Sequence, residues 1–188
     1  TPSTGNFPGA ITAADVNGDG KVDLIGSSTF DNTLTILTNA GNGVFGAIEE
    51  VDSTLMARQF VANVFGPLEL TRLLLPGLRA RKGHVIWIGS LAGRISLPFQ
   101  AHYSATKSAI SSVSDALRME LGPHGVRVTC VEPGDFATGF TSARQIVTVA
   151  SSPYAPHQAR CLTAVEKQER EAPSPERVAH LVERLCRM

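Results

Sequence analysis

The chain has 188 residues, of which 43% are hydrophobic and 18% are charged, so its size and composition are those of one globular domain with a core of its own. Lys and Arg together number 17, as do Asp and Glu, and this balance argues against nucleic acid or an anionic membrane as a partner. The three cysteines are too dispersed for a disulfide framework or a metal cluster, and no apolar run could span a bilayer, so a cytoplasmic location is expected.

The composition changes near residue 46. Residues 1–46 contain no Arg, Glu or His and are dense in Gly, Asn, Asp and Thr. Residues 47–188 hold all the Arg and Glu and alternate long amphipathic stretches with short apolar runs. This shift predicts two segments of different origin that overlap slightly, a β-rich segment over 1–46 and an α/β domain over 35–188.

The first segment reads as three short strands separated by Asn-Gly, Asp-Gly and Asp-Asn turns. Within it, "DVNGDGKVD" places oxygen ligands at alternating positions, in an arrangement that suits Ca²⁺. The alternative is an Asp/Asn-rich turn that binds nothing. The candidate ligands are Asp15, Asn17, Asp19, the backbone carbonyl of Lys21, and Asp23.

Residues 9–46, with "DVNGDGKVDLI" followed by "DNTLTILTNAGNGVF", resemble one FG-GAP/VCBS-type repeat, the blade unit of integrin-like β-propellers. The resemblance implies a calcium-binding or adhesion-type module without enzymatic activity. A propeller needs several blades to bury the faces of each, so this segment cannot form one alone.

The second segment predicts strands that alternate with helices, which is typical of a parallel sheet with crossover helices. A long helix is expected over 53–81, bent or shortened by Pro67 and Pro76, and another over 102–122. A last helix begins with Ser174 as N-cap and Pro175 in its first turn. The expected parallel strands lie near 34–38, 84–89 and 126–131, and a strand near 22–28 should pair with 33–38 as a hairpin that covers the open edge of the sheet.

Tyr103 and Lys107 stand four residues apart in the predicted helix and therefore share a face. An ammonium ~5 Å from a phenol favours the phenolate by ~3 kcal/mol at an effective dielectric of ~20, so the pKa of Tyr103 should fall by about two units. Ser90 ends the preceding strand, where its hydroxyl can bond a reacting oxygen. The alternative is a Tyr and a Lys that only solvate a surface. His102, His124 and His157 have no evident partner and are expected at the surface.

Four motifs resemble the short-chain dehydrogenase/reductase family in their order and separation: "TNAG" (38–41), "NVFG" (63–66), "WIGSLAGRISLPFQAHYSATKSA" (87–109) and "VEPGDFATGF" (132–140). The resemblance covers residues 35–188. It implies an α/β fold, a truncated Rossmann-like parallel sheet with flanking helices, preceded here by the short β-blade segment. It also implies NAD(P)(H) as cofactor and the interconversion of a secondary alcohol and a ketone as reaction.

By this resemblance, Tyr103 transfers the proton, Ser90 orients the substrate oxygen, Lys107 binds the ribose and Asn63 holds a water in the proton relay. The family's relatives also pair through two long helices, which implies a possible homodimer through 53–81 and 102–122. The residues implied in cofactor binding are Asn39, Ala40, Gly41, Tyr103, Lys107, Pro133, Gly134 and Thr138.

The family's opening strand, Gly-rich turn and helix, whose amides bind the pyrophosphate, have no counterpart in residues 1–34. The chain is therefore expected to bind the cofactor poorly, and its activity is expected to be impaired. "TNAGNGVFG" fits both resemblances, which suggests a chimera of two coding sequences joined at this string. The alternatives are a non-enzymatic Ca²⁺-binding or adhesion-type module and an inactive chimeric fragment.

Overall fold

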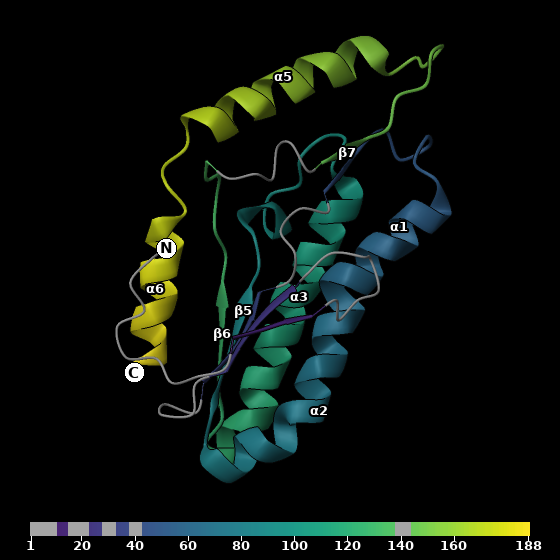
Figure 1. Ribbon diagram of the computed structural model, residues 1–188. Coiled ribbons are helices and arrows are strands. Elements are labelled where there is room, and N and C mark those ends of the chain that lie inside the picture. The colour runs from purple at the N-terminus through teal and green to yellow at the C-terminus, as the bar shows by residue number, and fades with distance from the viewer. Residues whose placement is uncertain (1–10, 15–22, 28–32, 38–42, 138–143) are drawn as a thin grey trace.

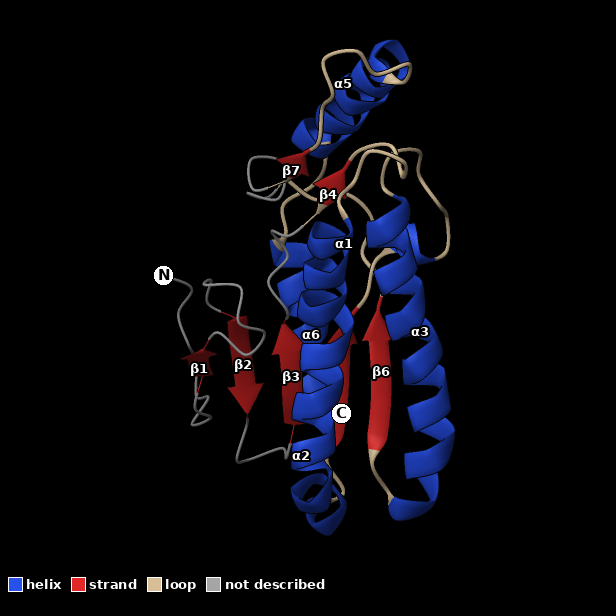
Figure 2. Ribbon diagram, turned by 90° about the vertical axis from the view of Figure 1, so that its right-hand side faces the viewer, coloured by secondary structure: helices blue, strands red, loops and turns tan. Residues whose placement is uncertain are grey.

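The computed structural model describes residues 11–14, 23–27, 33–37, 43–137 and 144–188. Its main sheet has five strands in the order β1-β2-β3-β5-β6 (Figure 2). The pairs β3·β5 and β5·β6 are parallel, whereas β1·β2 and β2·β3 are antiparallel. The strands are β1 (Ile11–Ala14), β2 (Asp23–Ser27), β3 (Thr33–Leu37), β5 (His84–Ile88) and β6 (Arg127–Val131).

The sheet confirms the predicted α/β fold class and the three predicted parallel strands to within about a residue at each end. The predicted hairpin is also confirmed, because β2 pairs antiparallel with β3 from Leu24 opposite Leu37 to Ser27 opposite Leu34. Strands β1 and β2 thus extend one edge of the same sheet. The division of the chain into a blade over 1–46 and a domain over 35–188 stays a prediction.

Strand β5 is buried on both faces, and its side chains alternate between two cores. Val85 and Trp87 pack with α2 (Gly66–Arg81) and α3 (Ala101–Leu121) on one face. Ile86 and Ile88 pack with α6 (Glu176–Cys186) on the other. Figure 1 shows the sheet between α6 on one side and α2 with α3 on the other. This two-sided burial is the reason that the strand reads as an uninterrupted apolar run.

The predicted helix 53–81 is helical throughout but consists of three parts, α1 (Ser53–Phe60), a π-helical turn η1 (Val61–Phe65) and α2. The side chain of Asp52 caps α1 by accepting hydrogen bonds from the amides of Thr54 and Leu55. The irregularity therefore precedes both prolines. Pro67 lies in the first turn of α2, where its missing N–H is tolerated, and Pro76 lies inside α2 without ending it. The prolines therefore do not shorten the helix, and the alternative expectation that they bend it stays a prediction.

Most of the remaining elements lie at the end of the sheet where β5 and β6 have their carboxyl ends (Figure 2). There, β4 (Val44–Phe45) pairs in parallel with β7 (Gln145–Ile146), and α5 (Ala155–Glu171) crosses the end of the molecule. Two 3₁₀ turns, η2 (Leu91–Gly93) and η3 (Gly122–His124), follow β5 and α3. Among the residues described, none of the helices has the length and apolar character that a bilayer span requires.

Candidate active site

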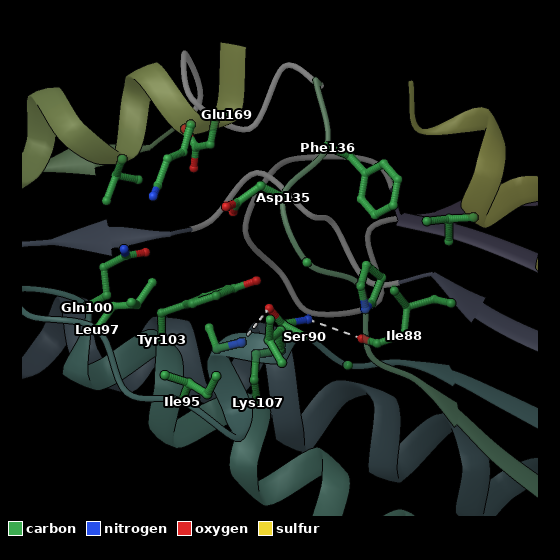
Figure 3. Close-up of a pocket in the computed structure, with 18 of the residues that line it drawn as sticks. Ile88, Ser90, Ile95, Leu97, Gln100, Tyr103, Lys107, Asp135, Phe136 and Glu169 are labelled. Carbon is green, nitrogen blue, oxygen red and sulfur yellow. Dashed lines mark hydrogen bonds between the residues drawn. The ribbon is translucent and has the colours of Figure 1, made fainter. Parts of the chain in front are cut away.

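A cavity of about 380 Å³ opens at the carboxyl ends of β5 and β6. Five of the predicted site residues line it: Ser90, Tyr103, Lys107, Pro133 and Gly134 (Figure 3). The amide of Leu91 donates to the carbonyl of Pro133 at 2.8 Å, so the segment after β6 is fixed beside the segment after β5. Parallel strands bring their carboxyl ends to one edge, and for this reason residues more than forty positions apart meet here.

Tyr103 projects from the first turns of α3, and its hydroxyl points toward Ser90 across the cavity (Figure 3). Burial raises the pKa of Tyr103 above its ordinary value, and the hydroxyl of Ser90 offsets this only in part. The expected fall in the pKa of Tyr103 is therefore wrong in direction. The charge of Lys107 favours the phenolate, but the loss of solvation on burial disfavours it and prevails.

Lys107 lies under the cavity floor, 6% exposed, with its Nζ 5.7 Å from the centre of the Tyr103 ring. The ammonium donates to the carbonyl of Ile88 at 3.2 Å (Figure 3). Burial lowers the pKa of Lys107 from 10.5 to about 8. Lys107 thus titrates much closer to neutral pH than a solvated lysine, and Tyr103 and Lys107 are both less inclined to carry charge than they would be in water.

Replacing Lys107 by Met should stabilise the fold at pH 7, because the native protein then no longer buries an ammonium. Between pH of about 8 and 10.5 the unfolded lysine binds a proton that the folded one has released, so the wild type gains stability as pH rises through this window. After allowance for the lost Ile88 bond, the variant should be more stable by about 1–3 kcal/mol at pH 7. Urea unfolding of both proteins at pH 7 and pH 10 measures the difference, which should nearly vanish at pH 10. A variant less stable than the wild type at pH 7 would contradict the cost assigned to this ammonium.

Asn63 lies in the π-helical turn η1 and is 4% exposed. Its Nδ2 donates to Oγ1 of Thr106 at 3.1 Å, and that hydroxyl donates to the backbone carbonyl of Tyr103 at 2.7 Å. Asn63 does not line the cavity, so the structure connects it to Tyr103 through Thr106 and the backbone of α3. π-Helical turns are often found at functional sites.

Gly93 sets the distance between the Ser90 segment and α3. A Cβ at Gly93 would lie 2.7 Å from the carbonyl carbon and 2.9 Å from the carbonyl oxygen of Lys107. The hydroxyl of Ser108 donates to the carbonyl of Gly93 at 2.5 Å and holds the two segments together. Only glycine permits this approach of one backbone to another. The contact keeps Ser90 within reach of Tyr103.

Gly93→Ala should therefore cost about 1–3 kcal/mol of stability and separate Ser90 from Tyr103. The matched control is Gly77→Ala in α2, where an added Cβ meets nothing within 4 Å. That change should be neutral or stabilising by up to about 1 kcal/mol, since Ala favours a helix. Thermal unfolding of the two variants checks the pair, and equal effects would contradict the close approach at Gly93.

Four further residues at the cavity were not predicted as site residues from the sequence. Asp135, Glu169 and Gln100 line it, and Arg144 forms an ion pair with Glu169 in which both side chains are buried, at 1% and 8% exposure. Burial raises the pKa of Asp135, and the charge of Glu169 raises it further. Glu169 belongs to α5, so the ion pair attaches this helix to the site.

Several predicted residues cannot be placed. Asn39, Ala40, Gly41 and Thr138 lie outside the described residues, as do Asp15, Asn17, Asp19 and Lys21 of the calcium-type loop. Asp23 begins β2. In the described part of the chain, no three His, Cys, Asp or Glu residues gather in a way that could hold a metal ion.

The parallel sheet, its crossover helices and the cluster at its carboxyl edge define a Rossmann-like α/β protein. The model of the short chain dehydrogenase family matches residues 23–146, and the chain belongs to this family. The match begins inside the stretch assigned above to a propeller blade, and the comparisons do not support that repeat, a calcium site or a chimera.

Among its relatives, a 3-ketodihydrosphingosine reductase from Bacteroides thetaiotaomicron is 38% identical over 76% of this chain and 54% of its own length. A short-chain dehydrogenase from Streptomyces avermitilis matches with a TM-score of 0.68 and 32% identity, over 81% of this chain and 54% of that one. A mutant 4-hydroxyisoleucine dehydrogenase complexed with NADH and succinate, 21% identical over 82% and 60% with a TM-score of 0.63, shows the fold alone. The chain spans 46% to 65% of the length of three curated relatives.

Proposed function

We propose that this chain is the catalytic part of an NAD(P)(H)-dependent oxidoreductase that interconverts a secondary alcohol and a ketone. The observation that carries the proposal is the placement of Ser90 and Tyr103 together in the lining of a cavity whose floor holds a buried Lys107. A phenol beside a hydroxyl can both orient and protonate a carbonyl oxygen. Tyr103 then transfers the proton and Ser90 positions the reacting oxygen.

The donor set at the cavity fits a nicotinamide cofactor. Lys107 uses one of its three N–H groups on Ile88, which leaves two for the hydroxyls of a ribose. Pro133 and Gly134, fixed beside Ser90, would border the nicotinamide. When bound, the cofactor supplies the hydride. The chain's own residues hold the ribose, orient the carbonyl and deliver the proton at its oxygen.

The direction of the Tyr103 pKa shift favours ketone reduction near neutral pH, because burial keeps the phenol protonated and ready to donate. Alcohol oxidation requires the phenolate and should accelerate as pH rises. The name of one relative, a reductase of a 3-keto compound, agrees with this direction.

We further propose that the affinity for the cofactor is low. In the described residues of 11–37, three antiparallel strands stand at the sheet edge, where a strand, Gly-rich turn and helix would bind a pyrophosphate. The calcium-type loop, the membership of residues 1–46 in a separate unit and the relay role of Asn63 stay predictions.

The test is an assay of the purified chain with NADH or NADPH and a panel of aliphatic ketones, read as loss of nicotinamide absorbance, together with a titration of nicotinamide fluorescence. The expected result is slow turnover that saturates only at high cofactor concentration. No turnover and no cofactor binding would contradict the oxidoreductase proposal. Micromolar binding would contradict the low affinity.

A homodimer through 53–81 and 102–122 is also proposed. Large apolar side chains lie exposed on these helices, with Phe65 58%, Leu73 59% and Met119 74% exposed. Covering them would remove apolar surface from water. Sedimentation equilibrium at micromolar concentration should give a dimer, and a monomer would contradict it.

A further inference from the structure

Gln100 contributes a buried carboxamide to the wall of the cavity. It is 4% exposed and lines the cavity together with Tyr103 (Figure 3). Its Nε2 is buried without a hydrogen-bond partner among the residues that the structure describes. The side chain does not cap α3, although the backbone carbonyl accepts from the amide of Ser104 at 2.9 Å. A buried amide without a partner is destabilising, so the fold alone gives no reason for a glutamine here.

The position of Gln100 places it close to the reacting group. It stands three residues before Tyr103 at the start of the same helix, a spacing that puts two Cβ atoms about 5–6 Å apart. A carboxamide on a side chain of this length therefore reaches an atom one or two bonds away from a carbonyl that Tyr103 protonates.

A different part of the cavity lining is apolar. Leu91, Ile95 and Leu97 follow Ser90 in the chain and line the cavity, yet they are 46%, 57% and 38% exposed. These three exposed aliphatic side chains form an apolar surface at the cavity mouth. An alkyl chain that packs on this surface leaves water, which favours its binding.

The charges at the cavity disfavour an anionic substrate. Asp135 and Glu169 both line it, and the pKa of Asp135 is raised by burial and by the charge of Glu169. Arg144 is engaged by Glu169 in a buried ion pair. A substrate carboxylate brought into this cavity would meet these two acids, and the cation among the lining residues is Lys107 at the floor.

We propose that Gln100 is the specificity-determining residue and that the substrate is an aliphatic ketone with a hydroxyl on the carbon beside the carbonyl. The carboxamide Oε1 accepts a hydrogen bond from this hydroxyl, while the alkyl chain lies on Leu91, Ile95 and Leu97. The inference rests on the proposed function. In the reaction the carbonyl carbon receives the hydride, its oxygen receives the proton of Tyr103, and the second hydroxyl is unchanged.

The experiment measures binding without cofactor, by NMR titration of the chain with 1-hydroxydecan-2-one, 2-decanone and 2-oxodecanoate. The wild type should bind the hydroxyketone about tenfold more tightly than 2-decanone, as expected for one neutral hydrogen bond. Gln100→Leu should lose this preference and bind 2-decanone unchanged. Gln145→Leu, the same change at an exposed residue of β7 away from the cavity, should keep it. The oxo acid should bind more weakly than 2-decanone.

An equal preference for the hydroxyketone in wild type and Gln100→Leu overturns the proposal, as does tighter binding of the oxo acid. Gln100→Met is read in the same way if the Leu variant melts early. Turnover with NADPH is measured in parallel. A preference that depends on Gln100 in a chain without turnover supports Gln100 as the residue that binds the hydroxyl and contradicts the oxidoreductase proposal. Turnover without the preference supports the oxidoreductase proposal and contradicts the role of Gln100.

Discussion

Tyr103→Phe should lower kcat/KM for ketone reduction by about 10²–10⁴-fold, the range that a positioned proton donor contributes. The change removes one oxygen atom and leaves the ring, its burial and the Lys107 contact in place. It also removes the phenol hydroxyl that lies beside Ser90 in the cavity lining. Binding of a ketone should change far less than its turnover, because the lost interaction matters most as the carbonyl oxygen gains charge.

The chain offers a matched control, because it contains one other tyrosine. The Tyr154 hydroxyl donates to Glu49 at 2.6 Å, in a contact exposed to solvent and outside the cavity. Tyr154→Phe should therefore change kcat/KM by no more than about twofold, since surface contacts of this kind contribute little. Equal losses in both variants, or none in Tyr103→Phe, would remove Tyr103 from the reaction.

The local pattern of the sequence was sufficient to predict the part of the fold that holds the site. The apolar runs around Val85 and Val128 predicted buried parallel strands, and the i, i+4 spacing of Tyr103 and Lys107 placed both on one helix face. The edge pairing of β2 with β3 followed from the need to cover unpaired backbone groups. These features depend on neighbours in the sequence or on rules that hold for any sheet.

Features that depend on burial by distant segments were missed. His102 was expected at the surface and is 3% exposed, because α3 contacts α1, η1 and η2 as well as the sheet. The sign of the Tyr103 pKa shift was wrong for a related reason, since the walls that desolvate it come from separate elements. Helix α5 arises from a stretch of mixed polarity for which no helix was predicted.

The Arg144–Glu169 ion pair should dominate the stability of the region that joins α5 to the cavity. Arg144→Met leaves Glu169 in a buried position without its cation, and removal of one partner from a buried pair costs about 3–5 kcal/mol. The exposed pair Arg72–Glu69, at 67% and 55% exposure, supplies the control. Arg72→Met should cost less than about 1 kcal/mol. Chemical denaturation of both variants at pH 7 measures the contrast.

A double variant distinguishes the charge of Arg144 from its side-chain volume. Arg144→Met with Glu169→Leu removes both charges and should recover most of the loss, because neither charge of the pair is left buried. If the double variant were as unstable as Arg144→Met at pH 7, the side-chain volume and hydrogen bonds of Arg144 would account for the effect, and its pairing with Glu169 would not.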